Sequence, residues 1–310
     1  MQKARQSTDA VLMIRPCRFF LNPETADDNA FQKQGSDFNQ AQLTTAARRE
    51  FDDAVALLRK HEVTVHVIED SVLPEKPDAV FPNNWISTHA DGRVAIYPIL
   101  SRARRRERRA DVIDELGRHY AVKAVVDYSA HENKAEYLEG TGSLVLDHIN
   151  RVAYASFSQR THPAPLQDFC VDFDFEPVPF HSLDQNGHVI YHTNVMMCLG
   201  TKFAMIGLSS IPDSAERKCV REKLENSGRE VVELSPDQIA NFAGNAIELH
   251  NAHEQMLVLS TRARKALTDE QMRHLEKYAR ILALDLPTIE LAGGSARCMM
   301  VTIHLPRLAG

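Results

Sequence analysis

Near the end of the chain, a cysteine follows a glycine-rich turn and precedes an apolar run. The order is Gly293-Gly294-Ser295-Ala296-Arg297-Cys298, and Met299-Met300-Val301-Thr302-Ile303 comes next. Glycine permits the tight backbone that presents a side chain into a cavity, and a thiol is nucleophilic as its thiolate. A lone cysteine is also a common buried apolar residue. Cys298 is therefore a candidate nucleophile if other reactive groups converge on it.

Two further residues could activate such a thiol. Glu139 is bracketed by Leu138 and Gly140, and His192 lies between Tyr191 and Thr193; an apolar strand is expected just after each. A nucleophile, an imidazole that moves protons and a carboxylate that orients the imidazole form a recurrent catalytic set. The chain has fourteen histidines, so His192 stands out only through its place in a repeat.

The repeat consists of five segments that each predict a strand, a tight turn, a second strand, and then usually a helix and another strand. The equivalent positions are Asn84, Gly142, Asn194, Asn245 and Cys298, with spacings of 58, 52, 51 and 53 residues. A near-constant period of this size indicates repeated units in a solenoid or a closed propeller. Five units favour closure, which would gather these strand starts around one central pocket. The alternative is that hairpins of similar length merely look alike.

Composition bounds the class of protein. The chain has 310 residues, 44% hydrophobic and 25% charged, with a formal net charge of -6, which suits one well-cored catalytic domain over residues 1–310. Five scattered cysteines without a CxxC pair indicate free thiols in a reducing compartment. No apolar run approaches membrane length, and no signal-peptide pattern is present. We therefore expect a cytoplasmic protein that does not bind membranes.

One local stretch is strongly basic. Residues Arg102 to Arg109 include six arginines, and acidic residues follow at Asp111, Asp114 and Glu115. Such a run could contact nucleic acid. In a net acidic chain without interleaved aromatic residues, the simpler interpretation is a solvated helix face, and we expect no nucleic-acid partner.

The chain resembles the penteins, the five-fold pseudosymmetric guanidino-group-modifying enzymes that include deiminases, dimethylarginine hydrolases and amidinotransferases. The matching motifs occur in the family's order: Asp78 to Asn84, Leu138 to Gly140, Ser158 to Thr161, His192 to Asn194, and Gly293 to Cys298. The resemblance implies an α/β propeller of ββαβ-type repeats. It implies Cys298 as the nucleophile, with Glu139 and His192 as its acid–base and substrate-positioning partners. It also implies Arg160 as a carboxylate clamp and Asp78 as a ligand of a substrate α-ammonium group.

The chain departs from the deiminase pattern at two positions. Deiminases usually carry Asp where this chain has Asn84, and often Asp where it has Asn194. A carboxylate would pair with a cationic guanidinium, whereas an amide can donate to a neutral ureido oxygen and accept from its NH2 group. The pattern therefore resembles the citrulline-utilisation hydrolase (citrulline ureidase) branch, with Asn84 and Asn194 as substrate-binding residues. The alternative is that Asn83 and Asn84 are simply turn residues.

The expected reaction converts L-citrulline to L-ornithine, carbon dioxide and ammonia through a thiocarbamate on Cys298, without a metal or organic cofactor. The alternatives are a guanidine hydrolase of the arginine deiminase or dimethylarginine hydrolase type, an amidinotransferase, and a non-catalytic amino-acid-binding protein. The segment from Asn22 to Thr45 is interpreted either as a lid or as a surface loop. A homodimer is the expected assembly.

Overall fold

The computed structural model describes residues 5–25, 29–32 and 39–308, and within them fifteen strands form five three-stranded sheets. Their orders are β15-β1-β2, β3-β4-β5, β6-β7-β8, β9-β10-β11 and β12-β13-β14. The strands are β1 (Ala10–Arg15), β2 (Thr64–Glu69), β3 (Ile86–Thr88), β4 (Arg93–Ile96), β5 (Ala124–Asp127), β6 (Leu144–Asp147), β7 (Val152–Ser156), β8 (Glu176–Phe180), β9 (Met197–Leu199), β10 (Phe203–Ile206), β11 (Glu230–Glu233), β12 (Ile247–His250), β13 (Gln255–Ser260), β14 (Arg280–Leu284) and β15 (Val301–Thr302).

Every sheet has the same internal pattern. The central strand of each sheet, such as β1 or β4, is antiparallel to one neighbour and parallel to the other. A parallel pair needs a crossover, which is usually helical. The α-helices are α1 (Gln40–Lys60), α2 (Ala110–His119), α3 (Gly140–Ser143), α4 (Pro163–Phe173), α5 (Ser214–Asn226), α6 (Pro236–Ala240), α7 (Thr261–Ala266) and α8 (Asp269–Leu275). The predicted repeat of ββαβ units is confirmed, with Asp213 and Thr268 capping α5 and α8.

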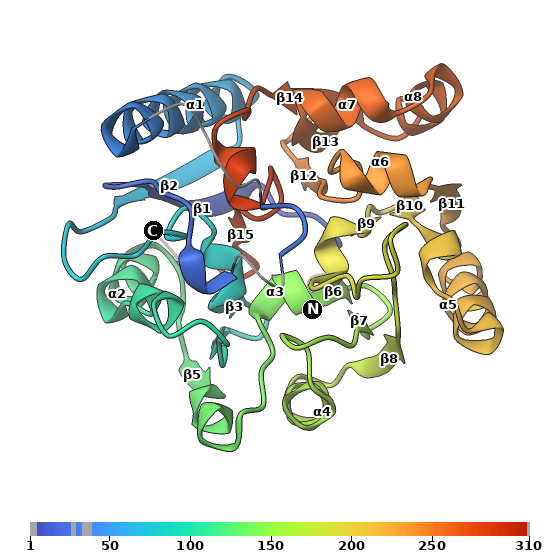
Figure 1. Cartoon of the computed structure of the whole chain (residues 1–310), viewed down its shortest axis with the longest axis horizontal. Coiled ribbons are helices and arrows are strands. Elements are labelled where there is room, and N and C mark those ends of the chain that lie inside the picture. Colours follow the sequence, from blue (N-terminus) through green and yellow to red (C-terminus); the bar gives the residue numbers. More distant parts are fainter. Residues whose placement is uncertain (1–4, 26–28, 33–38, 309–310) are drawn as a thin grey trace.

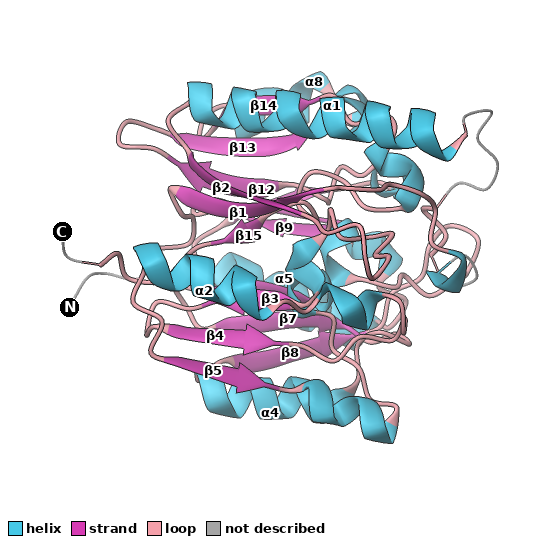
Figure 2. Cartoon of the chain, turned by 90° about the vertical axis from the view of Figure 1, so that its left-hand side faces the viewer, coloured by secondary structure: helices cyan, strands magenta, loops and turns pink. Residues whose placement is uncertain are grey.

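The sheets surround a common centre, and the long helices lie on the outside (Figure 1). Figure 2 shows the strands side on, with α1 and α4 at opposite edges of the molecule. The ring closes because β15, near the end of the chain, pairs with β1 through Val11↔Thr302 and Leu12↔Val301. A side-chain bond links this sheet to the next, since Thr88 Oγ1 donates to the Thr302 carbonyl at 2.9 Å.

The crossover helices are held by one apolar face. In α1 the buried residues recur every three or four positions, at Leu43, Ala47, Phe51, Ala54, Val55 and Leu58. This period places them on one face, which packs against the sheets. Asn39 caps the helix in a capping box with Gln42, which satisfies two otherwise unpaired backbone N–H groups. No helix in the described residues is long and apolar enough to cross a membrane.

The turn between β3 and β4 contains a buried histidine. His89 is 2% exposed, its ring centroid lies 4.0 Å from that of Phe173, and its Nε2 lies 2.9 Å from Ser87 Oγ. Burial lowers the pKa of His89 well below its ordinary value, and protonation of the neighbouring His304 and the charge of Arg151 would act in the same direction. The imidazole is therefore neutral in the folded protein near neutral pH.

We predict that acidification destabilises the fold through His89. Unfolded His89 takes up a proton below about pH 6.5 while the folded residue does not, so its contribution is retained above that pH and lost as the pH falls. The loss is at most about 2 kcal/mol of unfolding free energy between pH 7 and about pH 5. Urea unfolding at both pH values should show a smaller pH dependence for His89→Gln. An equal pH dependence in the exposed control His188→Gln and in His89→Gln would contradict the assignment.

Candidate active site

The five repeat positions meet at one end of the ring. Asn84 ends the short turn η2 (Pro82–Asn84), and Asn194 lies in the equivalent turn η5 (Thr193–Val195). Asn245 Nδ2 donates to the Asn194 carbonyl at 3.1 Å, and the Arg297 N–H donates to Asn245 Oδ1 at 3.1 Å. The turns that precede the inner strands are thus bonded to one another around the centre.

Two glycines let these turns approach closely. A Cβ at Gly140 would lie 2.3 Å from the Asn83 carbonyl oxygen, and Gly140 has a φ of +48°, which side chains disfavour. A Cβ at Gly142 would lie 2.3 Å from Asn84 Nδ2 and 2.8 Å from His192 Nδ1. The Asn84 amide and the His192 ring therefore meet at the Cα of Gly142, where only a hydrogen fits.

Glu139 and His192 form a buried pair. His192 Nε2 lies 2.9 Å from Glu139 Oε2, and both residues are at most 2% exposed. Burial opposes ionisation of Glu139, but the Arg160 charge and the His192 hydrogen bond lower the pKa of Glu139 to about 2. Burial lowers the pKa of His192, although Glu139 acts in the opposite direction. We conclude that an ionised Glu139 faces a neutral His192 at neutral pH.

This arrangement determines where the imidazole proton lies. An ionised carboxylate only accepts hydrogen bonds, so His192 Nε2 carries the proton that it shares with Glu139. The other ring nitrogen, Nδ1, then has a free lone pair and lies beside Gly142. His192 can therefore take a proton at Nδ1 and return it.

The NH2 groups of two asparagine side chains are close to the sulfur of the candidate nucleophile. Asn245 Nδ2 is 3.2 Å and Asn194 Nδ2 is 3.5 Å from Cys298 Sγ. The Asn245 amide cannot be reversed without losing a bond, because its Oδ1 accepts the Arg297 N–H. Cys298 itself is 3% exposed, and its N–H donates to the Ser295 carbonyl at 3.0 Å. The thiol is thus held among N–H donors, which favour negative charge on sulfur.

Arg104 is a buried residue of this site. Its guanidinium donates to both oxygens of Glu107 at 2.9 Å and to Asn84 Oδ1 at 2.7 Å. The expectation of a solvated basic face is wrong for Arg104, which is 3% exposed, and correct for Arg102 and Arg106, which are exposed. The run is not one continuous helix: η3 (Arg104–Glu107) ends before α2 begins, and Arg104 and Glu107 are the buried residues of η3.

The expected amino-acid anchors also line this region. Arg160 Nη1 lies 3.5 Å from Glu139 Oε2, and its guanidinium lies over the Tyr191 ring at 4.8 Å. Asp78 Oδ2 accepts a hydrogen bond from Asn22 Nδ2 at 2.8 Å, and burial raises the pKa of Asp78 while the Arg104 charge lowers it. The side chains of Arg160 and Asp78 are each at most 4% exposed to solvent.

One narrow cavity collects most of these side chains, with room of about 10 Å³, which is near the size of one water molecule. It is lined by Thr25, Asn29, Asp78, Phe81, Asn84, Arg104, Arg160, Tyr191, His192, Ala292, Gly294 and Cys298. Thr25 and Asn29 belong to the segment interpreted as a lid or a surface loop; within it, residues 26–28 and 33–38 lie outside the described residues, and α1 begins at Gln40. Its described part forms a wall of the cavity.

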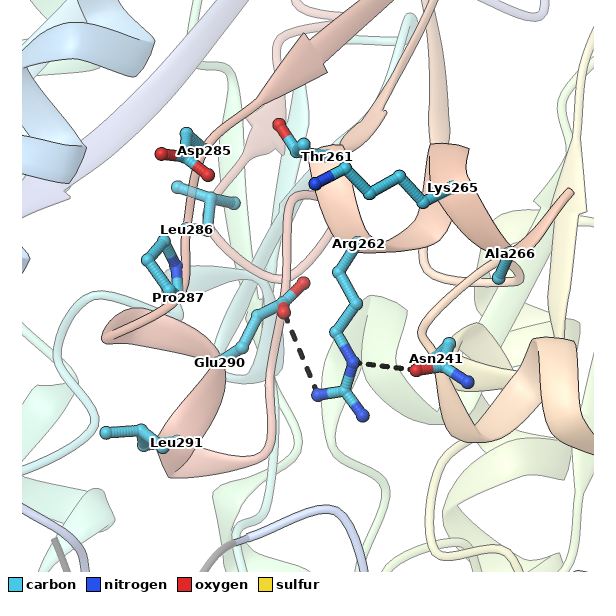
Figure 3. Close-up of a pocket in the computed structure, with 10 residues that line it drawn as sticks. All are labelled: Asn241, Thr261, Arg262, Lys265, Ala266, Asp285, Leu286, Pro287, Glu290 and Leu291. Atoms are coloured by element: carbon cyan, nitrogen blue, oxygen red, sulfur yellow. Dashed lines mark hydrogen bonds and ion pairs between the residues drawn. The ribbon is translucent and has the colours of Figure 1, made fainter.

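A larger cavity, of about 660 Å³, lies elsewhere (Figure 3). Arg262 projects into it between Asn241 and Glu290, at 2.9 Å from Asn241 Oδ1 and 3.9 Å from Glu290 Oε2. Its walls lack a cysteine or a histidine. We assign the chemistry to the small cavity, because a nucleophile, a proton carrier and oriented amides meet there. Glu290 still braces that site, since it accepts a hydrogen bond from Ser295 Oγ at 2.7 Å.

The structure brings together the predicted residues Cys298, His192, Glu139, Asn84, Arg160 and Asp78. Asn194 contacts the thiol but lines a second cavity along the axis instead of the small one. The sequence interpretation did not assign roles to Arg104, Asn245 and Asn22. Asn245 had a usable signal, its repeat position, whereas Arg104 was hidden in a basic run. No group of three or more His, Cys, Asp or Glu side chains among the described residues is arranged to hold a metal ion.

Solved structures share this fold at low sequence identity. The N-terminal domain of ArgZ, an arginine dihydrolase from the ornithine-ammonia cycle in cyanobacteria, matches with a TM-score of 0.74 and 16% identity over 96% of this chain and 99% of that chain. AgrE matches with a TM-score of 0.72 and 17% identity over 97% of this chain and 40% of its own. A dimethylarginine dimethylaminohydrolase H162G adduct with S-methyl-L-thiocitrulline matches with a TM-score of 0.65 and 12% identity over 94% and 98% of the two chains.

Sequence relationships give the family. No curated protein matches the chain. The model of the family "N,N dimethylarginine dimethylhydrolase, eukaryotic" matches residues 15–305, which include every candidate site residue. The chain therefore belongs to this family of the pentein superfamily, and it is a cysteine-dependent hydrolase that acts on C–N bonds.

Proposed function

We propose that the protein hydrolyses L-citrulline to L-ornithine, carbon dioxide and ammonia. One observation carries this choice: Arg104 Nη1 donates to Asn84 Oδ1 at 2.7 Å. A guanidinium has donors only, so it determines which end of the Asn84 amide is the oxygen. The other end, Nδ2, is buried and has no hydrogen-bond partner in the described structure. Asn84 therefore offers a donor to the substrate.

A donor suits a ureido group better than a guanidinium. The ureido oxygen of citrulline accepts hydrogen bonds, whereas every nitrogen of an arginine guanidinium donates. The carboxylate of Glu139 is already engaged by the Leu100 N–H at 3.0 Å, by His192 and by Arg160. A cationic guanidinium substrate would thus meet another donor at Asn84 and a carboxylate at Glu139 that already has several partners. Removing such a substrate from water would therefore be costly.

The proposed substrate orientation follows from these groups. Arg160 binds the α-carboxylate of citrulline, and Asp78 binds its α-ammonium group. The ureido carbon then lies over Cys298 Sγ, with its oxygen on Asn84 Nδ2. Negative charge that develops on this oxygen during attack is stabilised by the Asn84 donor, in the manner of an oxyanion hole. Asn194 and Asn245 hold the sulfur in place.

The proposed reaction has two stages. The Cys298 proton passes to His192 Nδ1 as sulfur attacks the ureido carbon, and His192 then returns this proton to the departing nitrogen of ornithine. A thiocarbamate remains on Cys298. In the second stage His192 takes a proton from water, the resulting hydroxide attacks the thiocarbamate, and the thiol leaves with that proton. Carbamate is released and decomposes to carbon dioxide and ammonia. Throughout, Glu139 holds the ring and stabilises its charged form.

A second candidate is hydrolysis of a guanidine. The family is that of the N,N-dimethylarginine dimethylhydrolases, and ArgZ, which shares the fold, is an arginine dihydrolase. Two buried carboxylates, Asp78 and Glu139, favour this candidate because they lie near the cavity and carry negative charge. The proposed site and nucleophile are the same in both cases, and the substrate differs.

We predict that purified protein releases ornithine and ammonia from L-citrulline and leaves L-arginine and N,N-dimethylarginine unchanged. Asn84→Asp places a second acceptor in the cavity, so citrulline turnover should fall by about 10²-fold or more, as when one oxyanion donor is lost. Cys298→Ser should abolish turnover. Chromatographic measurement of ornithine, citrulline and ammonia checks all three proteins. Citrulline formed from arginine or dimethylarginine would replace the proposal with the second candidate.

We also predict that Gly142→Ala inactivates the enzyme without unfolding it. The added methyl group must displace the Asn84 amide or the His192 ring, and a displacement of about 1 Å can cost about 10²-fold in rate. The matched control is Gly117→Ala in α2, where nothing lies within 4 Å of the new Cβ. Turnover and thermal unfolding should be measured for both variants. Equal turnover of the two variants would show that the contact at Gly142 is not needed.

A further inference from the structure

Arg297, next to Cys298 in the chain, occupies the opposite side of the catalytic turn from the substrate cavity. It is partly buried and lines a cavity along the axis of the ring, with room of about 50 Å³. Its Nη1 donates to the Met300 carbonyl at 2.7 Å, which folds the guanidinium back beneath the turn that holds the thiol. Asn194, whose amide touches Cys298 Sγ, lines the same cavity.

The other cations around Cys298 are neutralised by carboxylates. On the substrate side, Arg104 is paired with Glu107 and Arg160 with Glu139, and Asp78 lies 3.6 Å from Arg104. His192 on this side is neutral near neutral pH, because burial lowers its pKa. These groups leave no excess positive charge on the substrate side of the thiol.

On the side of the cavity along the ring axis, the cation is Arg297, and it has no carboxylate partner in the described part of the chain. Arg297 forms no ion pair within 4 Å in the described part of the chain. The Glu248 carboxylate in the same cavity is engaged by the N–H and hydroxyl of Thr201, at 3.0 and 2.5 Å. His148 and His304 also line this cavity, and burial lowers the pKa of each well below its ordinary value, so they are uncharged near neutral pH.

Within the described part of the chain, two thiols act electrostatically on Arg297. Burial lowers the pKa of Arg297, and negative charge on Cys298 and on Cys198 acts in the opposite direction. Cys198 cannot supply that charge at neutral pH, because burial raises its pKa to about 12. Cys298 differs from Cys198 because two amide N–H groups lie on its sulfur, where they can stabilise a negative charge that forms there.

We propose that Arg297 is a positioning residue for charge: its unpaired guanidinium, held beneath the catalytic turn, stabilises the thiolate form of Cys298. The thiolate arises when the thiol proton leaves for His192, and a cation on the side away from the substrate lowers the cost of that step without blocking attack. The inference rests on Cys298 as the nucleophile in the proposed function, and it holds for a ureido or a guanidino substrate alike.

The test measures the charge state of the thiol without substrate. Wild type, Arg297→Lys, Arg297→Gln and Arg297→Met are treated with iodoacetamide from about pH 6 to pH 10. The alkylation rate of Cys298 is followed by mass spectrometry after digestion with a protease that does not cut at arginine. We expect the Gln and Met variants to react about tenfold more slowly at neutral pH and to reach the wild-type rate at high pH, since one tenfold step corresponds to one pH unit. Arg297→Lys should keep most of the wild-type reactivity.

Two controls separate charge from structure. Arg280→Met removes an exposed cation that pairs with Glu254 on the outer part of a sheet, and its Cys298 should alkylate like wild type. Thermal unfolding of each variant reports whether the fold is retained. The proposal is overturned if the Gln and Met variants match wild type at every pH, or if they are slower by one constant factor at every pH, which would indicate altered access. A protein that fails to hydrolyse citrulline but shows the pH-dependent effect would contradict the proposed function alone.

Discussion

The whole arrangement depends on the pairing of β1 with β15. This contact spans two residue pairs, yet it joins the two ends of the described chain and converts a row of sheets into a ring. Its small hydrogen-bonded area is supplemented by apolar burial, because Val11, Leu12, Met299, Met300 and Val301 are all at most 2% exposed. Closure brings Cys298 beside Asn194 and Asn245, more than fifty residues earlier in the chain. An open array of the same five units would leave the thiol without its partners.

The second constraint is the balance of charge inside the ring. Arg104, Glu107, Glu139 and Arg160 are each at most 3% exposed, and burying such groups without partners would be prohibitive. Arg104 therefore faces Glu107 and Arg160 faces Glu139, and Asp78 also lies near Arg104. This pairing also limits what the cavity can accept. Carboxylates that neutralise internal arginines have less charge to offer to a cationic substrate.

Much of the architecture could be predicted from sequence because it follows from a period. The repeat positions and the order of strands within each unit rest on local patterns, and the structure confirms them. The closed pocket follows from the same period, since equivalent strand starts must meet if the ring closes. The roles assigned to Cys298, His192 and Glu139 remain proposals, although their side chains do converge.

The sequence could not reveal contacts that depend on side-chain direction. Arg104 lies in a run in which Arg102 and Arg106 are exposed, and no local pattern distinguishes the one that turns inward. Asn194 has the spacing of a substrate ligand, but its amide nitrogen lies on Cys298 Sγ. Asn22 reaches Asp78 across a long sequence separation, which a single sequence does not encode in any short motif.

The polarity of the Asn84 side chain is determined by its neighbours in the structure. An asparagine side chain has a donor end and an acceptor end of nearly equal size, so its presence alone is compatible with a substrate oxygen or a substrate N–H. Arg104 removes this ambiguity, because its guanidinium can bond only to the oxygen. The backbone N–H of Arg297 does the same for Asn245 and leaves the Asn245 NH2 group to the thiol. The donors that bind the two amide oxygens therefore determine the orientation of both side chains. As a result, the NH2 group of Asn84 is available to the substrate and that of Asn245 to the sulfur. A site built in this way favours negative charge on oxygen and on sulfur, which is the charge that forms when a thiolate attacks a carbonyl carbon.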